Sequence, residues 1–163
     1  MTTLKDLKKY GAEFGFTEDM KNLGFTIGPN GFWFYRQREV ILDVVFFHNT
    51  STGHWTQPSV LMLVDGLLED YDMKEFPKSF TKNVSFINDV CITENGIEHP
   101  WHRWEIRDKN KIQESFRSII DVMRSSGDNW FRSVSSKKDL WNLLKECVKE
   151  TPREKEIWDL LNA

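Results

Sequence analysis

Few residues of this 163-residue chain have the type and surroundings to carry chemistry, and two aspartates come first. Asp43 and Asp65 each interrupt a run that is otherwise apolar, and burying a lone carboxylate is costly. With His102 they would suit general acid and base catalysis on a nucleotide or small molecule, and with Glu69 they would suit Mg²⁺. The alternative, which we favour, is that each aspartate meets an arginine or a backbone donor, or lies where its strand leaves the core.

Metal and nucleophile chemistry have weaker support. His99 and His102 form a His-x-x-His pair around Pro100, but no carboxylate or cysteine follows at a helical spacing. Cys91 and Cys147 have neither a CxxC motif nor a second pair, which favours two buried, reduced thiols. The chain also lacks G-x-S-x-G, G-x-x-x-x-G-K-S/T and G-x-G-x-x-G motifs. We therefore expect no catalytic residues, no metal and no cofactor.

The elements that must hold these residues begin with a hairpin over residues 31–48. Two runs of aromatic and β-branched residues flank a polar segment, residues 36–39. Because both strands are apolar on both faces, we expect the hairpin in the middle of a sheet covered by helices. The hairpin also raises the question of why Asp43 lies among Leu42, Val44 and Val45.

Further strands are predicted where apolar runs lie between turn residues. They cover residues 25–27, 59–68 and 84–93, with loops over residues 49–54 and 70–82. Asn95-Gly96 is a strong hairpin dipeptide, and its return strand is predicted over residues 97–106. Pro100 cannot donate to a ladder, so this strand should be an edge strand or bulged.

Helices are predicted at both ends of the chain. The N-terminal pattern falters at Gly11, and a second short helix should start at Thr17, whose hydroxyl can cap it. Later helices are predicted where apolar residues recur at helical spacing, over residues 112–123, 140–148 and 152–161. Gly127 should end the first of these.

Capping residues support two of the later helices. Asp108 or Asn110 can cap the helix that contains residues 112–123, and Ser136 with Asp139 resembles a capping box. Strands followed by helices predict an α+β fold. We expect a single domain, residues 1–163, with a mostly antiparallel sheet of about five strands on which the N-terminal and C-terminal helices pack.

The charges are unevenly distributed. Residues 42–108 hold eleven acidic and five basic side chains, whereas residues 1–41 and 109–163 carry small net positive charges. A nucleic-acid-binding protein usually shows a basic stripe with aromatic residues, so we expect no nucleic-acid partner. A basic protein partner suits the acidic region better, although carboxylates that merely solvate loops and strand edges are an alternative.

Targeting signals are absent from the sequence pattern. The N-terminal residues lack the basic flank and apolar run of a signal peptide, and no apolar run is long enough to cross a bilayer. We therefore expect a cytoplasmic protein with no membrane partner.

The order of features resembles the bacterial domain-of-unknown-function 4304 (DUF4304) family over residues 17–148. The matching segments are Leu23-Gly24-Phe25, Phe34-Tyr35-Arg36, residues 40–47, 60–68 and 101–106, Asn129-Trp130-Phe131 and residues 136–140. Residues 70–82 and the last helix have no counterpart in that pattern. The resemblance implies an α+β domain without established catalytic residues. Small domains of this kind often accompany polymorphic toxins as immunity proteins, so the implied role is to neutralise a cognate toxin.

We therefore expect an immunity-type protein that binds a basic toxin domain, for example a nuclease, and blocks it sterically and electrostatically. Contact-dependent growth inhibition is one setting for such a pair. The acidic contact candidates are Asp65, Glu69, Asp70, Asp72 and Glu75. Trp101 and Arg103 share one face of the predicted edge strand and are possible anchors, because Trp and Arg are enriched at interfaces. An enzyme that uses Asp43, Asp65 and His102 and a regulatory interaction module remain as alternatives.

Overall fold

The structure, a computed structural model, describes residues 1–64, 90–98, 102–147 and 159. The loop expected over residues 70–82 lies outside this part of the chain. So do most of the strand expected over residues 84–93 and, apart from Asp159, the last helix. Among the described residues, no helix has the length and apolar character needed to cross a membrane.

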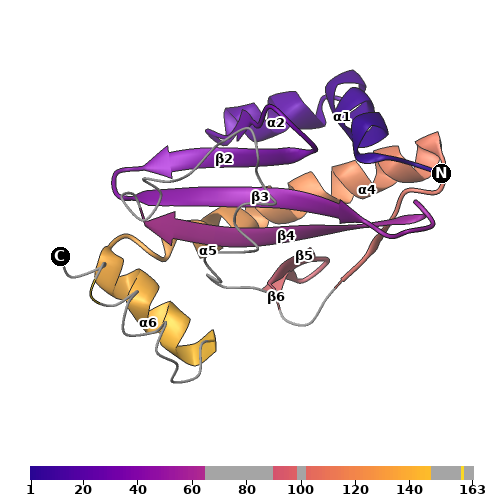
Figure 1. Cartoon of the computed structure of the whole chain (residues 1–163). Coiled ribbons are helices and arrows are strands. Elements are labelled where there is room, and N and C mark those ends of the chain that lie inside the picture. Colours follow the sequence, from indigo (N-terminus) through magenta and orange to yellow (C-terminus); the bar gives the residue numbers. More distant parts are fainter. Residues whose placement is uncertain (65–89, 99–101, 148–158, 160–163) are drawn as a thin grey trace.

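A seven-stranded antiparallel sheet forms the framework of the described chain (Figure 1). The strands from β1 to β6 are neighbours in chain order, and β7 pairs with β4. They are β1 Thr26–Ile27, β2 Trp33–Arg38, β3 Ile41–Asn49, β4 Trp55–Val64, β5 Cys91–Thr93, β6 Gly96–Glu98 and β7 Trp104–Glu105. With helices at both ends of the chain, this sheet confirms the α+β class. The number of strands exceeds the expected five in part because the single strand predicted over residues 97–106 is divided into β6 and β7.

The β2–β3 hairpin lies in the middle of the sheet, as the sequence predicts. Its turn is shorter than expected. Only Glu39 and Val40 lie between the strands, and β2 pairs with β3 as far as Arg38 opposite Ile41. Glu39 has a positive φ of 43°. Arg36 lies within β2, and its guanidinium is paired with the buried carboxylate of Asp43.

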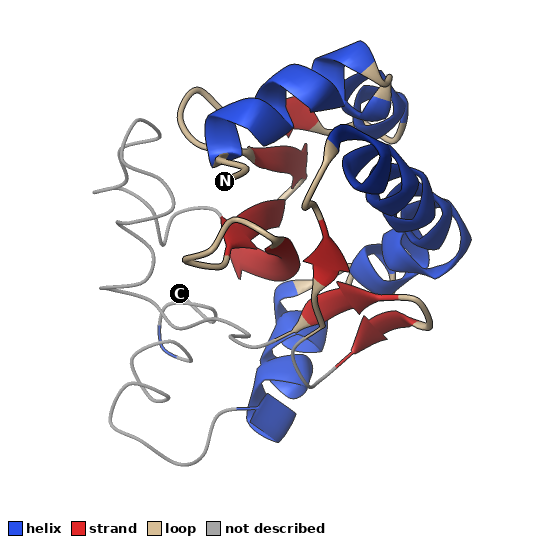
Figure 2. Cartoon of the chain, turned by 90° about the vertical axis from the view of Figure 1, so that its right-hand side faces the viewer, coloured by secondary structure: helices blue, strands red, loops and turns tan. Residues whose placement is uncertain are grey.

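Helices α1 Leu4–Glu13, α2 Phe16–Asn22 and α4 Lys109–Val122 lie over one face of the sheet (Figures 1 and 2). An aromatic cluster joins the two layers. Phe16 of α2 and Phe116 of α4 stack with ring centroids 4.5 Å apart. Three further rings contact Phe16: Phe34 of β2, Phe47 of β3, and Phe32, which comes just before β2.

The central strands are buried on both faces. Val45 of β3 lies on the face that carries the aromatic cluster, and Val44 and Leu63 lie on the opposite face. All three side chains are fully buried. Apolar residues on both faces of the hairpin are therefore explained by burial on both faces.

The N-terminal helices differ in detail from the prediction. α1 continues through Gly11, where an added Cβ would lie 3.1 Å from the Phe32 ring, so this glycine permits a close approach. α2 begins at the residue before Thr17, after Gly15 at a φ of 82°. Thr17 is therefore not the cap. A threonine does cap the first helix: Thr3 and Asp6 form a reciprocal capping box at the start of α1.

The return strand predicted over residues 97–106 is two strands in the structure. β6 pairs with β5, whereas β7 pairs with β4. Trp104 is buried, and its indole Nε1 donates to the carbonyl oxygen of Ile92 at 2.9 Å. Ile106 is buried and Arg103 is exposed, as the alternation predicts.

Gly127 does not end a helix, contrary to the prediction. The chain passes from α4 into the π-helix η1 Met123–Gly127 and then into α5 Asp128–Arg132. A Cβ at Gly127 would lie 2.8 Å from the Met123 sulfur, so a larger residue here would require the Met123 side chain to move. The last described helix is α6 Lys137–Cys147.

Asp108 and Ser136 cap the later helices, as predicted, but the return bonds of the capping box come from Ser135 instead of Ser136. The Asp108 carboxylate accepts a hydrogen bond from the backbone N–H of Lys111, at the start of α4. The Ser136 hydroxyl accepts one from the backbone N–H of Asp139, at the start of α6. Asp139 itself accepts hydrogen bonds from the backbone and side chain of Ser135, and these bonds lower the pKa of its carboxyl.

We expect Phe16→Ala to destabilise the protein by about 3–5 kcal/mol, because it removes a buried ring that contacts both layers. Urea unfolding gives this free energy. Val40→Ala is the control: Val40 lies exposed in the β2–β3 turn, and its substitution should cost less than about 0.5 kcal/mol. Equal effects of the two substitutions would contradict a core centred on Phe16.

Candidate functional site

Asp43, which interrupts the apolar β3 strand, lies in a buried cluster of charges. Its side chain is fully buried between two arginines of β2. Arg36 Nε donates to Oδ2 at 2.9 Å. Arg38 donates through Nε to Oδ2 at 2.6 Å and through Nη2 to Oδ1 at 2.8 Å. Because Arg36 pairs directly with Asp43 and Arg38 follows two residues later, all three side chains lie on one face of the sheet.

This Arg36–Asp43–Arg38 cluster also holds helix α5. Arg38 donates to the carbonyl oxygens of Phe131, at 2.9 Å, and Val134, at 2.8 Å. The last carbonyls of a helix have no partner within the helix, and here the guanidinium of Arg38 supplies one. At the other end of α5, Arg36 binds the carboxylate of Asp128.

Arg36 is buried with an aromatic ring against it. Its guanidinium lies 4.4 Å from the centre of the Phe25 ring, and its Nη1 donates to the carbonyl oxygen of Leu23 at 2.9 Å. Arginine suits such a position because its planar group can stack and hydrogen-bond at the same time. Arg36 therefore joins the sheet, the end of α2 and the start of α5.

The contacts of Asp43 decide its chemistry. Both carboxylate oxygens accept hydrogen bonds from arginines, and no part of the side chain reaches the surface. A general base must reach the proton that it removes from a substrate. Asp43 therefore fits the structural alternative, in which an arginine neutralises it, and does not fit the catalytic role.

Asp128 extends the cluster towards the surface. Partial burial disfavours its charged form, but hydrogen bonds from Arg132 and Arg36 outweigh this effect and hold the pKa of the Asp128 carboxyl below its usual value. The hydrogen bond between Arg132 and Asp128 also raises the pKa of Arg132. The charged state of Asp128 thus contributes to folding stability.

Of the predicted contact residues, the structure describes Arg103 alone. Arg103 is exposed and has no ion-pair or hydrogen-bond partner within the described ranges, next to the buried Trp104. The other candidates lie outside the described residues: Asp65, Glu69, Asp70, Asp72, Glu75 and Trp101. Asp65 is therefore not placed relative to Asp43.

Two acidic side chains of this region lie close to His102 and Arg107. His102 Nε2 lies 3.5 Å from the carboxylate of Glu94, and its ring meets that of Trp104 edge-on. Arg107 lies 3.6 Å from Glu105. Asp43 contacts Arg36 and Arg38, whereas His102 contacts Glu94. Among the described residues, the predicted catalytic pairing of Asp43 with His102 is therefore not found.

Cys91 is a buried free thiol, as predicted. Its sulfur accepts a hydrogen bond from the Gln57 amide and lies 3.9 Å from the Ser59 hydroxyl. The side chain of Cys147 lies outside the described residues. Within the part of the chain that is described, no three His, Cys, Asp or Glu side chains gather in a group that could hold a metal ion.

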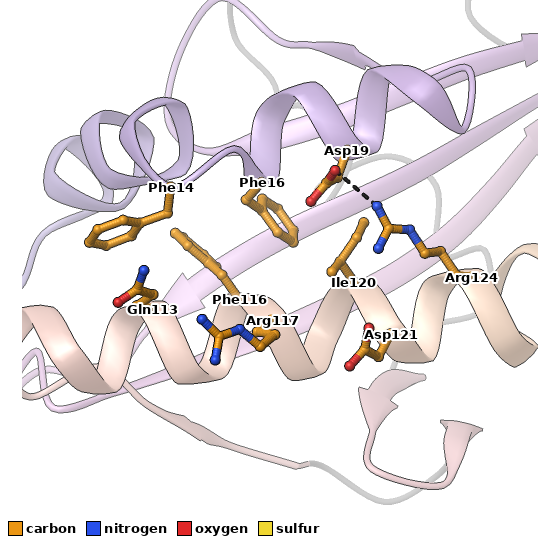
Figure 3. A pocket seen from close by; sticks show the side chains of 9 residues that line it. All are labelled: Phe14, Phe16, Asp19, Gln113, Phe116, Arg117, Ile120, Asp121 and Arg124. Atoms are coloured by element: carbon orange, nitrogen blue, oxygen red, sulfur yellow. Dashed lines mark hydrogen bonds and ion pairs between the residues drawn. The ribbon is translucent and has the colours of Figure 1, made fainter.

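A small pocket lies between α2 and α4 (Figure 3). Sequence patterns did not reveal it, because its lining comes from segments about a hundred residues apart. The residues that line it are Phe14, Phe16, Asp19, Gln113, Phe116, Arg117, Ile120, Asp121 and Arg124. The one sequence pattern that relates to this pocket is the row of polar residues that lies beside the apolar stripe of α4.

Comparison of the chain with family models, curated proteins and solved structures finds no match. The contacts of each residue are therefore the basis for its role. The resemblance to the domain-of-unknown-function 4304 family stays an expectation from the sequence.

We expect acid to weaken folding through Asp128. Since the pKa in the folded state lies below the unfolded value of about 3.9, the stabilisation is present above that pH and is lost as the pH falls through the folded pKa. Urea unfolding of the wild type and Asp128→Asn should differ at about pH 7, and the difference should shrink towards zero at about pH 2.

Asp121→Asn is the matched control for this pH experiment. Asp121 is exposed on α4 and has no ion pair among the residues that the structure describes. Its substitution should change the free energy of unfolding by less than about 0.5 kcal/mol at either pH. A difference between the wild type and Asp128→Asn that does not depend on pH would contradict the ionic role of Asp128.

Proposed function

We propose that the chain is a cytoplasmic immunity-type protein that binds a cognate toxin domain and blocks it by steric and electrostatic contact. The contacts of Asp43 are the observation that carries this proposal. Both of its oxygens are bound by arginines in the core, so Asp43 is not free to act as a catalytic base. A role that depends on surface contacts is therefore favoured over catalysis.

The charge distribution supports a basic partner. Residues 42–108 hold eleven acidic and five basic side chains, and a toxin domain that acts on nucleic acid carries positive charge. Complementary charge speeds association and disfavours wrong partners. Asp43 is neutralised internally, but Glu94, at the β5–β6 turn, is 69% exposed and adds to the acidic surface.

Arg103 supports the proposal as an anchor residue. Its neighbour Trp104 is fixed by burial and by the hydrogen bond to Ile92, so the backbone at Arg103 is held against the sheet. An exposed arginine on a fixed segment loses little backbone entropy when it binds a partner. Arginine is also among the residue types that contribute most to interface energies.

Co-expression with the toxin tests the proposal. The probe is the C-terminal domain of a large secreted protein encoded beside this chain, expressed in cells whose growth it stops. We expect this chain to restore growth and the purified proteins to form a complex. Asp70→Lys combined with Asp72→Lys should weaken binding about tenfold or more, because it places like charges in the interface.

Glu114→Lys combined with Asp121→Lys is the matched control, since it makes the same change of charge at exposed positions of α4. This control should keep both growth rescue and affinity. Failure of the unmodified chain to bind the toxin domain would overturn the proposal. Binding without growth rescue would instead favour a regulatory interaction module, and equal losses in both double variants would remove the acidic segment as the contact.

A further inference from the structure

The turn of the β2–β3 hairpin has a backbone conformation that is unusual for its residue type. Glu39 has a positive φ of 43°. A residue with a Cβ is disfavoured in this region, and short hairpin turns usually place Gly, Asn or Asp there. Among the described residues, every other positive φ belongs to a glycine: Gly15, Gly24, Gly31, Gly53 and Gly96. The turn therefore carries a glutamate side chain where glycine would relieve backbone strain.

The strands beneath the turn hold it in place. Arg38 pairs with Ile41 at the base of the turn, and its guanidinium donates to the buried carboxylate of Asp43. The Gln37 amide donates a hydrogen bond to the carbonyl oxygen of Glu39 at 2.8 Å. Strained residues persist where the surrounding structure fixes them, and they are concentrated at functional sites. The Glu39 side chain is exposed, so the packing of the core does not explain it.

The turn presents an apolar side chain beside an acidic one. Val40 is 37% exposed, and within the described ranges the other large apolar side chain that is exposed is Met1, at the chain terminus. The Glu39 carboxylate has no ion pair among the residues that the structure describes. An apolar residue on a fixed turn can enter a depression on a partner, and a neighbouring carboxylate can pair with a basic residue at its rim.

The turn lies at the end of the sheet from which the predicted acidic segment starts. Ile41, the first residue of β3, pairs with Val64, the last residue of β4. The turn and the end of β4 are both at the left of the sheet in Figure 1. Asp65, the first of the predicted acidic contacts, follows Val64 directly in the sequence. A partner that binds where the chain leaves β4 therefore comes close to the turn.

We infer that the β2–β3 turn is a contact surface for the basic toxin domain, with Val40 as an apolar anchor and Glu39 paired with a lysine or arginine of that domain. This inference rests on the proposed function and adds a contact outside the acidic segment. A domain with an apolar depression bordered by basic residues fits the turn. A carboxylate that is needed for binding explains why glutamate is kept at a position that favours glycine.

Affinity and thermal unfolding, measured on the same full-chain variants, test the inference. The probe is the toxin domain described above, the C-terminal domain of the large secreted protein encoded beside this chain. Val40→Ala should weaken its binding about fivefold to tenfold and change the Tm by less than about 2 °C. Glu39→Gln removes the charge and keeps the shape, so it should weaken binding about fivefold.

Glu39→Gly separates the strain from the contact. Glycine adopts a positive φ without a steric penalty, so this variant should raise the Tm by about 2–4 °C. It should nevertheless weaken binding as much as Glu39→Gln does. A purely structural role of Glu39 would leave the affinity unchanged, and a Tm below that of the wild type would contradict the strain at this position.

Asp121→Asn is the matched control, because it removes one exposed carboxylate from α4. Its affinity should stay within about twofold of the wild type. If Asp70→Lys with Asp72→Lys weakens binding but the Val40 and Glu39 variants bind as the wild type does, this inference alone is overturned. If the unmodified chain does not bind the toxin domain, the proposed function fails and this contact fails with it.

Discussion

The pairing of Asp43 with Arg36 and Arg38 is the interaction on which the rest of the structure depends. Three charges lie in a region that is otherwise apolar, and each must find its partner for the core to close. A shift of one residue between β2 and β3 would move Asp43 to the other face of the sheet from Arg36. The cluster therefore specifies the register of the central hairpin, although a buried ion pair often adds little net stability over apolar residues.

The same cluster sets the position of the later helices. Arg38 binds the carbonyl oxygens of Phe131, in the last turn of α5, and of Val134, just beyond it. Arg36 binds Asp128 at the start of the helix, so α5 is fixed at both ends to β2. The stack of Phe16 on Phe116 joins α2 to α4 over the same face of the sheet. Charge thus fixes the helices at one end of this face, and aromatic packing fixes them along the rest.

This arrangement separates the buried charges of the framework from the charges at the surface. The charges in the core are occupied by one another, whereas Arg103 and Arg117 are exposed on segments that the framework holds in place. Binding at such positions needs little reorganisation of the chain. The Asp43 carboxylate, in contrast, is buried and bound by arginines, so it does not reach a molecule at the surface.

Much of the fold could be predicted from the sequence, because residue patterns report local structure directly. Apolar residues on both faces of the 31–48 hairpin predicted its central place. For Asp43 the favoured explanation left open an arginine, a backbone donor or a position where the strand leaves the core, and the structure shows the arginines. Gly11 and Gly127 misled the prediction, since each permits close packing inside a helical segment instead of ending a helix.

The candidate sites were harder to predict, because they depend on contacts between distant segments. Two ion pairs join residues that are about a hundred positions apart in the sequence: Arg36 with Asp128, and Asp19 with Arg124. No local pattern encodes such a pair. The predicted acidic contacts, residues 65–75, lie outside the described part of the chain and stay a prediction.

A double-mutant cycle of Asp43→Asn and Arg38→Gln, followed by urea unfolding, tests the central role of the cluster most directly. Because the two side chains share two hydrogen bonds in the core, the cycle should give a coupling energy of about 1.5–3 kcal/mol. The pair Asp43→Asn and Arg117→Gln, which do not touch, should be additive. Additivity within about 0.5 kcal/mol for Asp43 and Arg38 as well would contradict the account.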